Sequence, residues 1–138
     1  MAAARAGSGA RARHAGGEHD SVVARTDLGR PYRLILAGHT DTVPPNGNER
    51  ARREGDTLYG VGTADMKSGL AVMLDAARTI AEPAVDVTYV FYAREEVAAA
   101  ESGLQELFDA RPDLLVGDAA LLGEPTDGVL EATFPALS

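Results

Sequence analysis

The chain has 138 residues and a formal net charge of -8, from 13 lysine or arginine and 21 aspartate or glutamate residues. This length suits one domain, and the negative charge disfavours nucleic acids and anionic membranes as partners. Because cysteine is absent, disulfides, thiolate nucleophiles and cysteine-bound zinc are excluded, and we expect a reducing, cytoplasmic location.

The first 20 residues are low in complexity, and residues 2–20 carry no aliphatic side chain larger than alanine. Such a stretch cannot bury an apolar face, so we expect residues 1–20 to be disordered or loosely attached. No apolar run reaches the roughly 18 residues of a membrane-spanning helix, and no secretory signal is evident.

The next elements have the pattern of strands. Residues 22–26 and 32–37 are separated by a glycine- and proline-containing turn, which predicts a hairpin. Residues 44–56 are predicted to form a polar loop, and residues 57–60 a short strand.

A helix is predicted from Met66 to the stop at Pro83, because apolar residues recur at three- and four-residue steps. The strand at 85–93 is apolar on both faces and should be central. Ser102 resembles the start of a capping box that opens a short helix, with Leu104, Leu107 and Phe108 pointing inward.

A last strand is expected at 118–122, which completes an alternation of strands and helices. This order predicts an α/β fold, a three-layer-like sandwich with a mixed, partly parallel sheet, in which the hairpin supplies the antiparallel part.

Histidine and acidic residues follow three of these strands. In α/β sheets, sites gather beyond the carboxyl ends of strands, where His39, the pair Glu95-Glu96 and Glu124 are expected. Asp65 lies at the predicted helix start, where free backbone amides favour negative charge. One imidazole with several carboxylates suits zinc, cobalt or manganese, so these residues predict a metal site.

Each motif alone also has a simpler interpretation. His39 could be a hydrogen-bonded loop residue, although Asp41, two residues later, is placed to support a metal-bound imidazole. Glu95 and Glu96 could form a solvated turn; if they are functional, they face different directions, so one binds metal while the other transfers protons. Lys67 is expected in a charge pair at the helix start, without a catalytic role.

Four stretches together resemble the co-catalytic zinc aminoacylase and carboxypeptidase family, of the M20 type. They are residues 38–44 (GHTDTVP), 59–69 (YGVGTADMKSG), 95–96 (EE) and 123–126 (GEPT). The resemblance covers residues 21–132, which it identifies as part of a zinc-exopeptidase-like catalytic domain, with residues 133–138 as a divergent tail. Within the family, the chain is most similar to actinobacterial desuccinylases.

The resemblance implies two zinc ions per complete site, with cobalt as a possible substitute. His39 and Glu124 would bind one ion, Asp65 would bridge to the other, and Glu96 would bind the second. A cis peptide bond would follow Asp65.

The resemblance also assigns Glu95 as the general acid/base and Asp41 as the support of His39. The implied substrate is a small N-acyl amino acid: N-succinyl-LL-2,6-diaminopimelate would be hydrolysed to succinate and LL-diaminopimelate, in lysine and diaminopimelate biosynthesis. Acetylornithine deacetylase, or another aminoacylase or dipeptidase of the family, is the alternative.

Members of this family are more than twice as long and carry a lid and dimerisation domain, with a late histidine that completes the second zinc site. The sequence lacks these parts, so we expect a truncated form with weak or no activity, and without the family's homodimer interface. A noncatalytic metal-binding remnant is the alternative from another functional class.

Overall fold

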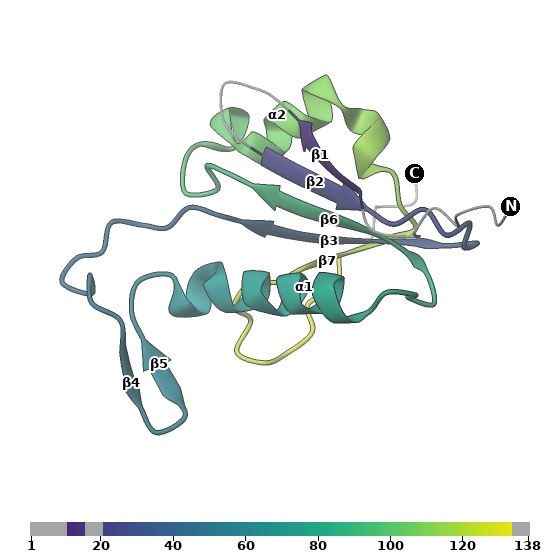
Figure 1. The fold of residues 1–138 in the computed structure, drawn as a ribbon. Coiled ribbons are helices and arrows are strands. Elements are labelled where there is room, and N and C mark those ends of the chain that lie inside the picture. Colours follow the sequence, from purple (N-terminus) through teal and green to yellow (C-terminus); the bar gives the residue numbers. More distant parts are fainter. Residues whose placement is uncertain (1–10, 16–20, 134–138) are drawn as a thin grey trace, which may run out of the picture.

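The computed structural model describes residues 11–15 and 21–133, which form a five-stranded sheet with helices on both faces (Figure 1). Along the sheet the strands are ordered β1 (Arg11–Ala15), β2 (Ser21–Arg25), β6 (Asp86–Tyr92), β3 (Arg33–His39) and β7 (Ala119–Leu122). Strand β3 is parallel to β6 and β7, whereas β2 is antiparallel to β6 and to β1. The predicted mixed, partly parallel sheet is therefore confirmed.

Two helices cover opposite faces of this sheet, which gives the predicted three layers (Figure 1). Helix α1 (Ser68–Thr79) packs with Leu70 and Met73 over Val87 and Tyr89 of β6. On the other face, α2 (Gly103–Ala110) packs through Leu107, beside Leu114 of the short helix η3 (Pro112–Leu115). The central strand serves both cores because its residues are apolar on both faces, as the sequence predicts.

The predicted hairpin between residues 22–26 and 32–37 is wrong, because β6 lies between β2 and β3. The connection from β2 to β3 instead crosses the end of β6, where the Asp86 carboxylate holds it. Asp86 accepts hydrogen bonds from the Thr26 hydroxyl at 2.8 Å and from the Leu28 and Arg30 amides at 2.8 and 3.0 Å. The glycine- and proline-containing turn is present, but the apolar β6 supplies a better partner for both strands.

Three local predictions also need correction. Arg11–Ala15, within the stretch expected to lack structure, pairs with β2, because strand pairing uses backbone groups and needs no large side chain. The predicted polar loop contains β4 (Arg52–Glu54), which pairs with β5 (Thr57–Tyr59) in a separate hairpin. Phe108 is exposed, since the short α2 turns only one narrow face toward the sheet.

The remaining helical segments are short: η1 (Thr63–Lys67) leads into α1, and η2 (Ala99–Glu101) precedes α2. As predicted, Ser102 caps α2, and its hydroxyl accepts a hydrogen bond from the Leu104 amide. The other predictions for residues 1–20, and most of the tail predicted at 133–138, lie outside the described residues. In the described part of the chain, none of the helices has both the length and the apolar character needed to cross a bilayer.

Candidate metal centre

The carboxyl ends of β3, β6 and β7 meet at one edge of the sheet, as parallel strands require. His39 is the last residue of β3 and lies opposite Tyr92, the last residue of β6. Glu95 and Glu96 follow β6, and Glu124 follows β7. The strand-end rule therefore brings the predicted residues to one place.

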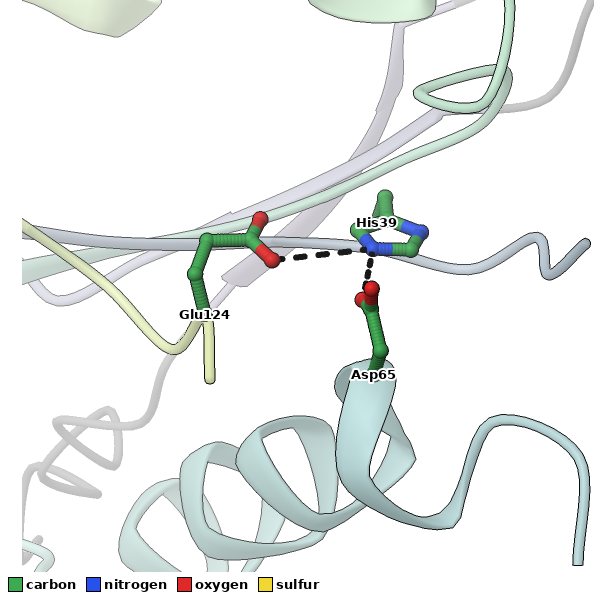
Figure 2. A group of neighbouring side chains, drawn as sticks. All are labelled: His39, Asp65 and Glu124. Carbon is green, nitrogen blue, oxygen red and sulfur yellow. Dashed lines mark hydrogen bonds and ion pairs between the residues drawn. The ribbon is translucent and has the colours of Figure 1, made fainter. Parts of the chain in front are cut away.

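His39 lies at the centre of this edge and is fully buried. Its Nε2 atom is 2.9 Å from Asp65 Oδ1 and 3.8 Å from Glu124 Oε2 (Figure 2). Two carboxylates thus approach the same ring nitrogen from different elements, η1 and the segment after β7. One ligand atom from each of these three residues lies within 4.8 Å of the others, which suits a single cation between them.

Glu95 and Glu96 form a second group with the same imidazole. One nitrogen of His39 and one oxygen of each glutamate also lie within 4.8 Å of one another, and both glutamates are exposed. The two groups share His39, so two neighbouring cation positions are compatible with the arrangement. The geometry does not by itself assign one glutamate to a metal and the other to protons.

Met66 packs between the elements that carry the site residues. Its side chain is fully buried, its sulfur accepts a hydrogen bond from the His39 amide at 3.3 Å, and the peptide bond that joins it to Asp65 is cis, as the resemblance implied. A Cβ added at Gly38, Gly69 or Gly123 would lie 2.4, 2.9 or 2.8 Å from the Met66 methyl group. Glycine at these three positions therefore lets the ends of β3 and β7 and the start of α1 close around Met66.

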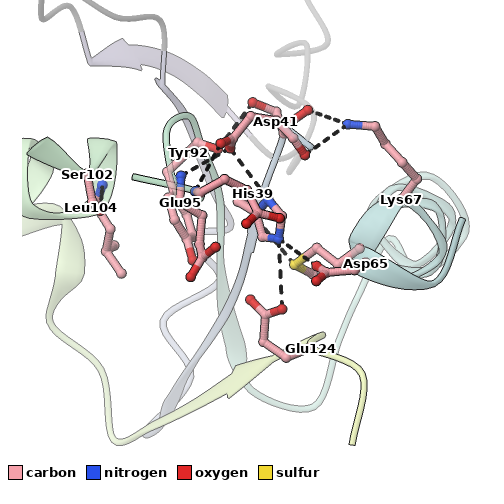
Figure 3. A network of polar contacts seen from close by, with 12 residues as sticks. His39, Asp41, Asp65, Lys67, Tyr92, Glu95, Ser102, Leu104 and Glu124 are labelled. Carbon is pink, nitrogen blue, oxygen red and sulfur yellow. Dashed lines mark hydrogen bonds and ion pairs between the residues drawn. The ribbon is translucent and has the colours of Figure 1, made fainter. Parts of the chain in front are cut away.

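Asp41 contacts more than the predicted histidine. Its Oδ1 atom is 3.4 Å from His39 Nδ1, and its two carboxylate oxygens accept hydrogen bonds from the Glu95 amide at 3.1 Å and the Glu96 amide at 3.2 Å (Figure 3). Sequence reasoning missed these amide contacts, because no spacing rule pairs residues that are more than fifty positions apart. A loop aspartate beside two strand ends was the only available signal.

The pKa shifts of Glu124 and His39 reflect several negative charges that lie close together. Burial, together with the charges of Asp65, Glu95 and Glu96, raises the pKa of Glu124, although His39 acts to lower it. Burial acts to lower the pKa of His39, but its hydrogen bond with Asp65 and the charges of Glu124 and Asp41 outweigh it and raise that pKa.

The buried Tyr92 is affected by the same charges. Burial, and then the charges of Glu124 and Glu95, raise the pKa of Tyr92 to about 12. A divalent cation would offset this excess of negative charge, and its preferred ligands, one imidazole and several carboxylates, are the groups present. The residues therefore fit a metal ion.

Comparisons with known proteins agree with this chemistry. A protein of Mycobacterium tuberculosis that carries the provisional name succinyl-diaminopimelate desuccinylase is 54% identical over 113 residues, covering 82% of this chain and 32% of that protein. The succinyl-diaminopimelate desuccinylase of Corynebacterium glutamicum is 48% identical over 117 residues, covering 83% and 32%. The acetylornithine deacetylase of Salmonella arizonae is 38% identical over 107 residues, covering 67% and 25%.

The fold has a counterpart in a solved structure. A metallo-carboxypeptidase of the M20 family from Sulfolobus solfataricus superposes with a TM-score of 0.64 at 22% identity, covering 83% of this chain and 28% of that one. The chain spans about a third of the length of the two desuccinylase relatives described above. Residues 35–135 match the model of peptidase family M20/M25/M40, and the chain belongs to that family, which implies a divalent-metal site.

Proposed function

We propose that the chain forms part of the catalytic site of a zinc-dependent amidohydrolase that acts on N-succinyl-LL-2,6-diaminopimelate. The observation that carries this proposal is the approach of Asp65 and Glu124 to one nitrogen of the buried His39. Family membership supports a metal-dependent hydrolase, and the names of the M. tuberculosis and C. glutamicum relatives support this substrate.

The ligands proposed for the first ion form one of the two groups of side chains, and the second pair follows the family resemblance. His39, Asp65 and Glu124 would hold one ion, while Asp65 and Glu96 would contribute to a second. Two zinc ions, or cobalt in their place, would polarise the amide carbonyl and make a bound water more acidic. Two carboxylates are an incomplete ligand set for zinc, so we propose that a further ligand for the second ion comes from elsewhere in a complete site.

Glu95 is the proposed general acid/base. Its carboxylate would take a proton from the attacking water and deliver it to the amine nitrogen as the C–N bond breaks, releasing succinate and LL-diaminopimelate. Asp41 would keep the imidazole of His39 oriented through Nδ1, since its oxygen already lies 3.4 Å from that atom.

Two alternatives remain open to experiment. Similarity to an acetylornithine deacetylase supports another N-acyl amino acid as substrate, although at lower identity. A noncatalytic metal-binding protein would keep the ligands without turnover. The cytoplasmic location and the family homodimer remain predictions, and no dimer surface is assigned to the described residues.

The test combines calorimetric titration with zinc and product analysis. Wild-type protein should bind zinc, and His39→Ala should lose at least about a hundredfold in affinity, because a direct ligand matters more than an outer-sphere partner. Glu95→Gln should keep zinc binding and abolish any release of succinate. Zinc binding without hydrolysis of the succinyl or acetyl substrate would favour the noncatalytic alternative, and equal zinc affinity in His39→Ala would refute the proposed ligand set.

A further inference from the structure

Lys67 crosses from the start of α1 to the loop that follows β3. Its ammonium group donates a hydrogen bond to the Thr40 carbonyl and lies 3.5 Å from the Asp41 carbonyl (Figure 3). The sequence predicts a charge pair at the helix start, but the ammonium faces backbone oxygens of another element. The contact therefore links two segments that both contribute proposed functional residues.

The loop that Lys67 contacts is fixed to β6 on its other side. The Thr40 amide donates to the Tyr92 carbonyl at 2.7 Å, and the Thr40 hydroxyl donates to the same oxygen at 3.2 Å. The next residue, Asp41, accepts hydrogen bonds from the Glu95 and Glu96 amides. A continuous path of contacts thus runs from Lys67 through Thr40 and Asp41 to the two glutamates.

The Glu95-Glu96 turn has a separate attachment to α2. Arg94, immediately before it, adopts a positive φ of 59° and its guanidinium lies 3.3 Å from the Glu106 carboxylate. This ion pair holds the turn from the α2 side of the sheet, whereas Asp41 holds its amides from the β3 side. The Asp41 carboxylate is therefore one of two attachments of this turn, and it is the one that binds the Glu95 and Glu96 amides directly.

Lys67 is suited to control the orientation of the Asp41 carboxylate. An ammonium group has three donors and no acceptor, so it can contact two successive carbonyl oxygens at once. Contact with the carbonyls of both Thr40 and Asp41 restricts rotation about φ and ψ of Asp41, the two rotatable bonds between those carbonyl groups. The direction of the Asp41 side chain is then set from the same helix start that carries Asp65.

We propose that Lys67 is a positioning residue, which orients the Thr40–Asp41 loop so that Asp41 fixes the Glu95-Glu96 turn relative to His39 and Asp65. The catalytic meaning of this arrangement rests on the proposed function, because Glu95 and Glu96 have their roles only there. The coupling of Lys67 to the Glu95 and Glu96 amides does not rest on the proposed function, and it can be measured without metal or substrate.

The experiment is residue-resolved amide hydrogen exchange on the full chain. Lys67→Met keeps most of the unbranched side chain but removes the donors. It should accelerate exchange at the Glu95 and Glu96 amides by about tenfold or more, the effect expected when hydrogen bonds to a charged acceptor weaken. Lys67→Arg should restore most of the protection, because it returns a positive donor group. Arg78→Met, on the exposed part of α1, is the matched control and should leave both amides unchanged.

Two results would overturn the proposal. One is that the Glu95 and Glu96 amides of Lys67→Met exchange at the same rates as in the wild type. The other is an equal loss of protection throughout β3 and β6, which would make Lys67 a general stabilising residue. If Lys67→Met does not fold, Lys67→Leu, which also lacks donors, is judged by the same measurement. Failure of zinc binding in the wild type would refute the proposed function, yet it would leave the exchange result intact.

Discussion

Acidic side chains lie at both ends of β6, but in opposite surroundings. At the amino end, Asp86 is surrounded by donors: the Thr26 hydroxyl, two backbone amides and, at 3.8 Å, the Arg33 guanidinium. At the carboxyl end, carboxylates face one another around a single imidazole. A carboxylate that accepts several hydrogen bonds, as Asp86 does, stabilises the fold. A group of carboxylates that face one another is instead suited to bind a cation.

The pKa values of Asp86 and Glu124 are shifted in opposite directions. Burial acts to raise the pKa of Asp86, but the hydrogen bonds from Leu28, Thr26 and Arg30 outweigh it, so its pKa lies below the ordinary value. The pKa of Glu124 is raised. The charged form of the carboxyl group is therefore favoured for Asp86 and disfavoured for Glu124.

The largest expected effect is on stability at the amino end. Asp86→Asn replaces an acceptor with an amide donor that faces other donors, and it should lower the free energy of unfolding by about 3 kcal/mol. Urea denaturation in the presence of a chelator measures this value. A loss below about 1 kcal/mol, as at an ordinary surface site, would contradict the structural role of Asp86.

The stability difference between wild type and Asp86→Asn should depend on pH. Because the folded-state pKa of Asp86 is lowered, its stabilisation is complete above the ordinary aspartate pKa and is lost as pH falls through the lower folded value. Denaturation curves collected from neutral to acidic pH should therefore converge at the acid end. A difference that stays constant down to that end would show that charge is not responsible.

Gly69→Ala tests how the carboxyl end is packed. Alanine gains about 1 kcal/mol in helix propensity, but its Cβ would lie 2.8 Å from the Gly123 carbonyl oxygen, and overpacking costs about 1–3 kcal/mol. We expect a small net loss of stability together with weaker zinc binding, because the segment carrying Glu124 must move. Val72→Ala, at an exposed position of α1, is the control and should leave zinc affinity unchanged.

The smallest effect on stability is expected from Glu124→Gln. Removing one charge from a crowded group relieves repulsion, so without metal the free energy of unfolding should stay within about 1 kcal/mol of the wild type or rise slightly. Urea denaturation of Glu124→Gln and Asp86→Asn in the same chelator-containing buffer compares their free energies of unfolding directly. Equal losses in the two variants would remove the distinction between the two ends of β6.

Sequence patterns predicted the layers and most elements, because hydrophobic periodicity reports which faces are buried. They also placed His39, Glu95, Glu96 and Glu124 at one edge of the sheet. The rule that sites lie beyond the carboxyl ends of strands depends only on those strands being parallel. The hairpin failed because strand pairing is decided by competition among distant segments, and β6 offered the better partner.

Contacts that depend on side-chain reach across the fold were not predictable. Three contacts join separate elements in this way. They are the hydrogen bond from Lys67 to the Thr40 carbonyl, the hydrogen bonds that the Asp41 carboxylate accepts from two backbone amides, and the close packing of Met66 against three glycines. Single residues such as Lys67 and Gly69 have ordinary helix-start interpretations in sequence. Their other role emerges only when the ends of β3 and β7 meet the start of α1.

X-ray absorption at the zinc edge tests the central claim most directly, because it reports the atoms bound to the metal. The zinc-loaded chain should show one imidazole nitrogen and oxygen ligands near about 2.0–2.2 Å. The imidazole signal should persist in a variant carrying His14→Ala and His19→Ala and vanish in His39→Ala, since these are the three histidines of the chain. An imidazole signal that survives in His39→Ala would contradict the account.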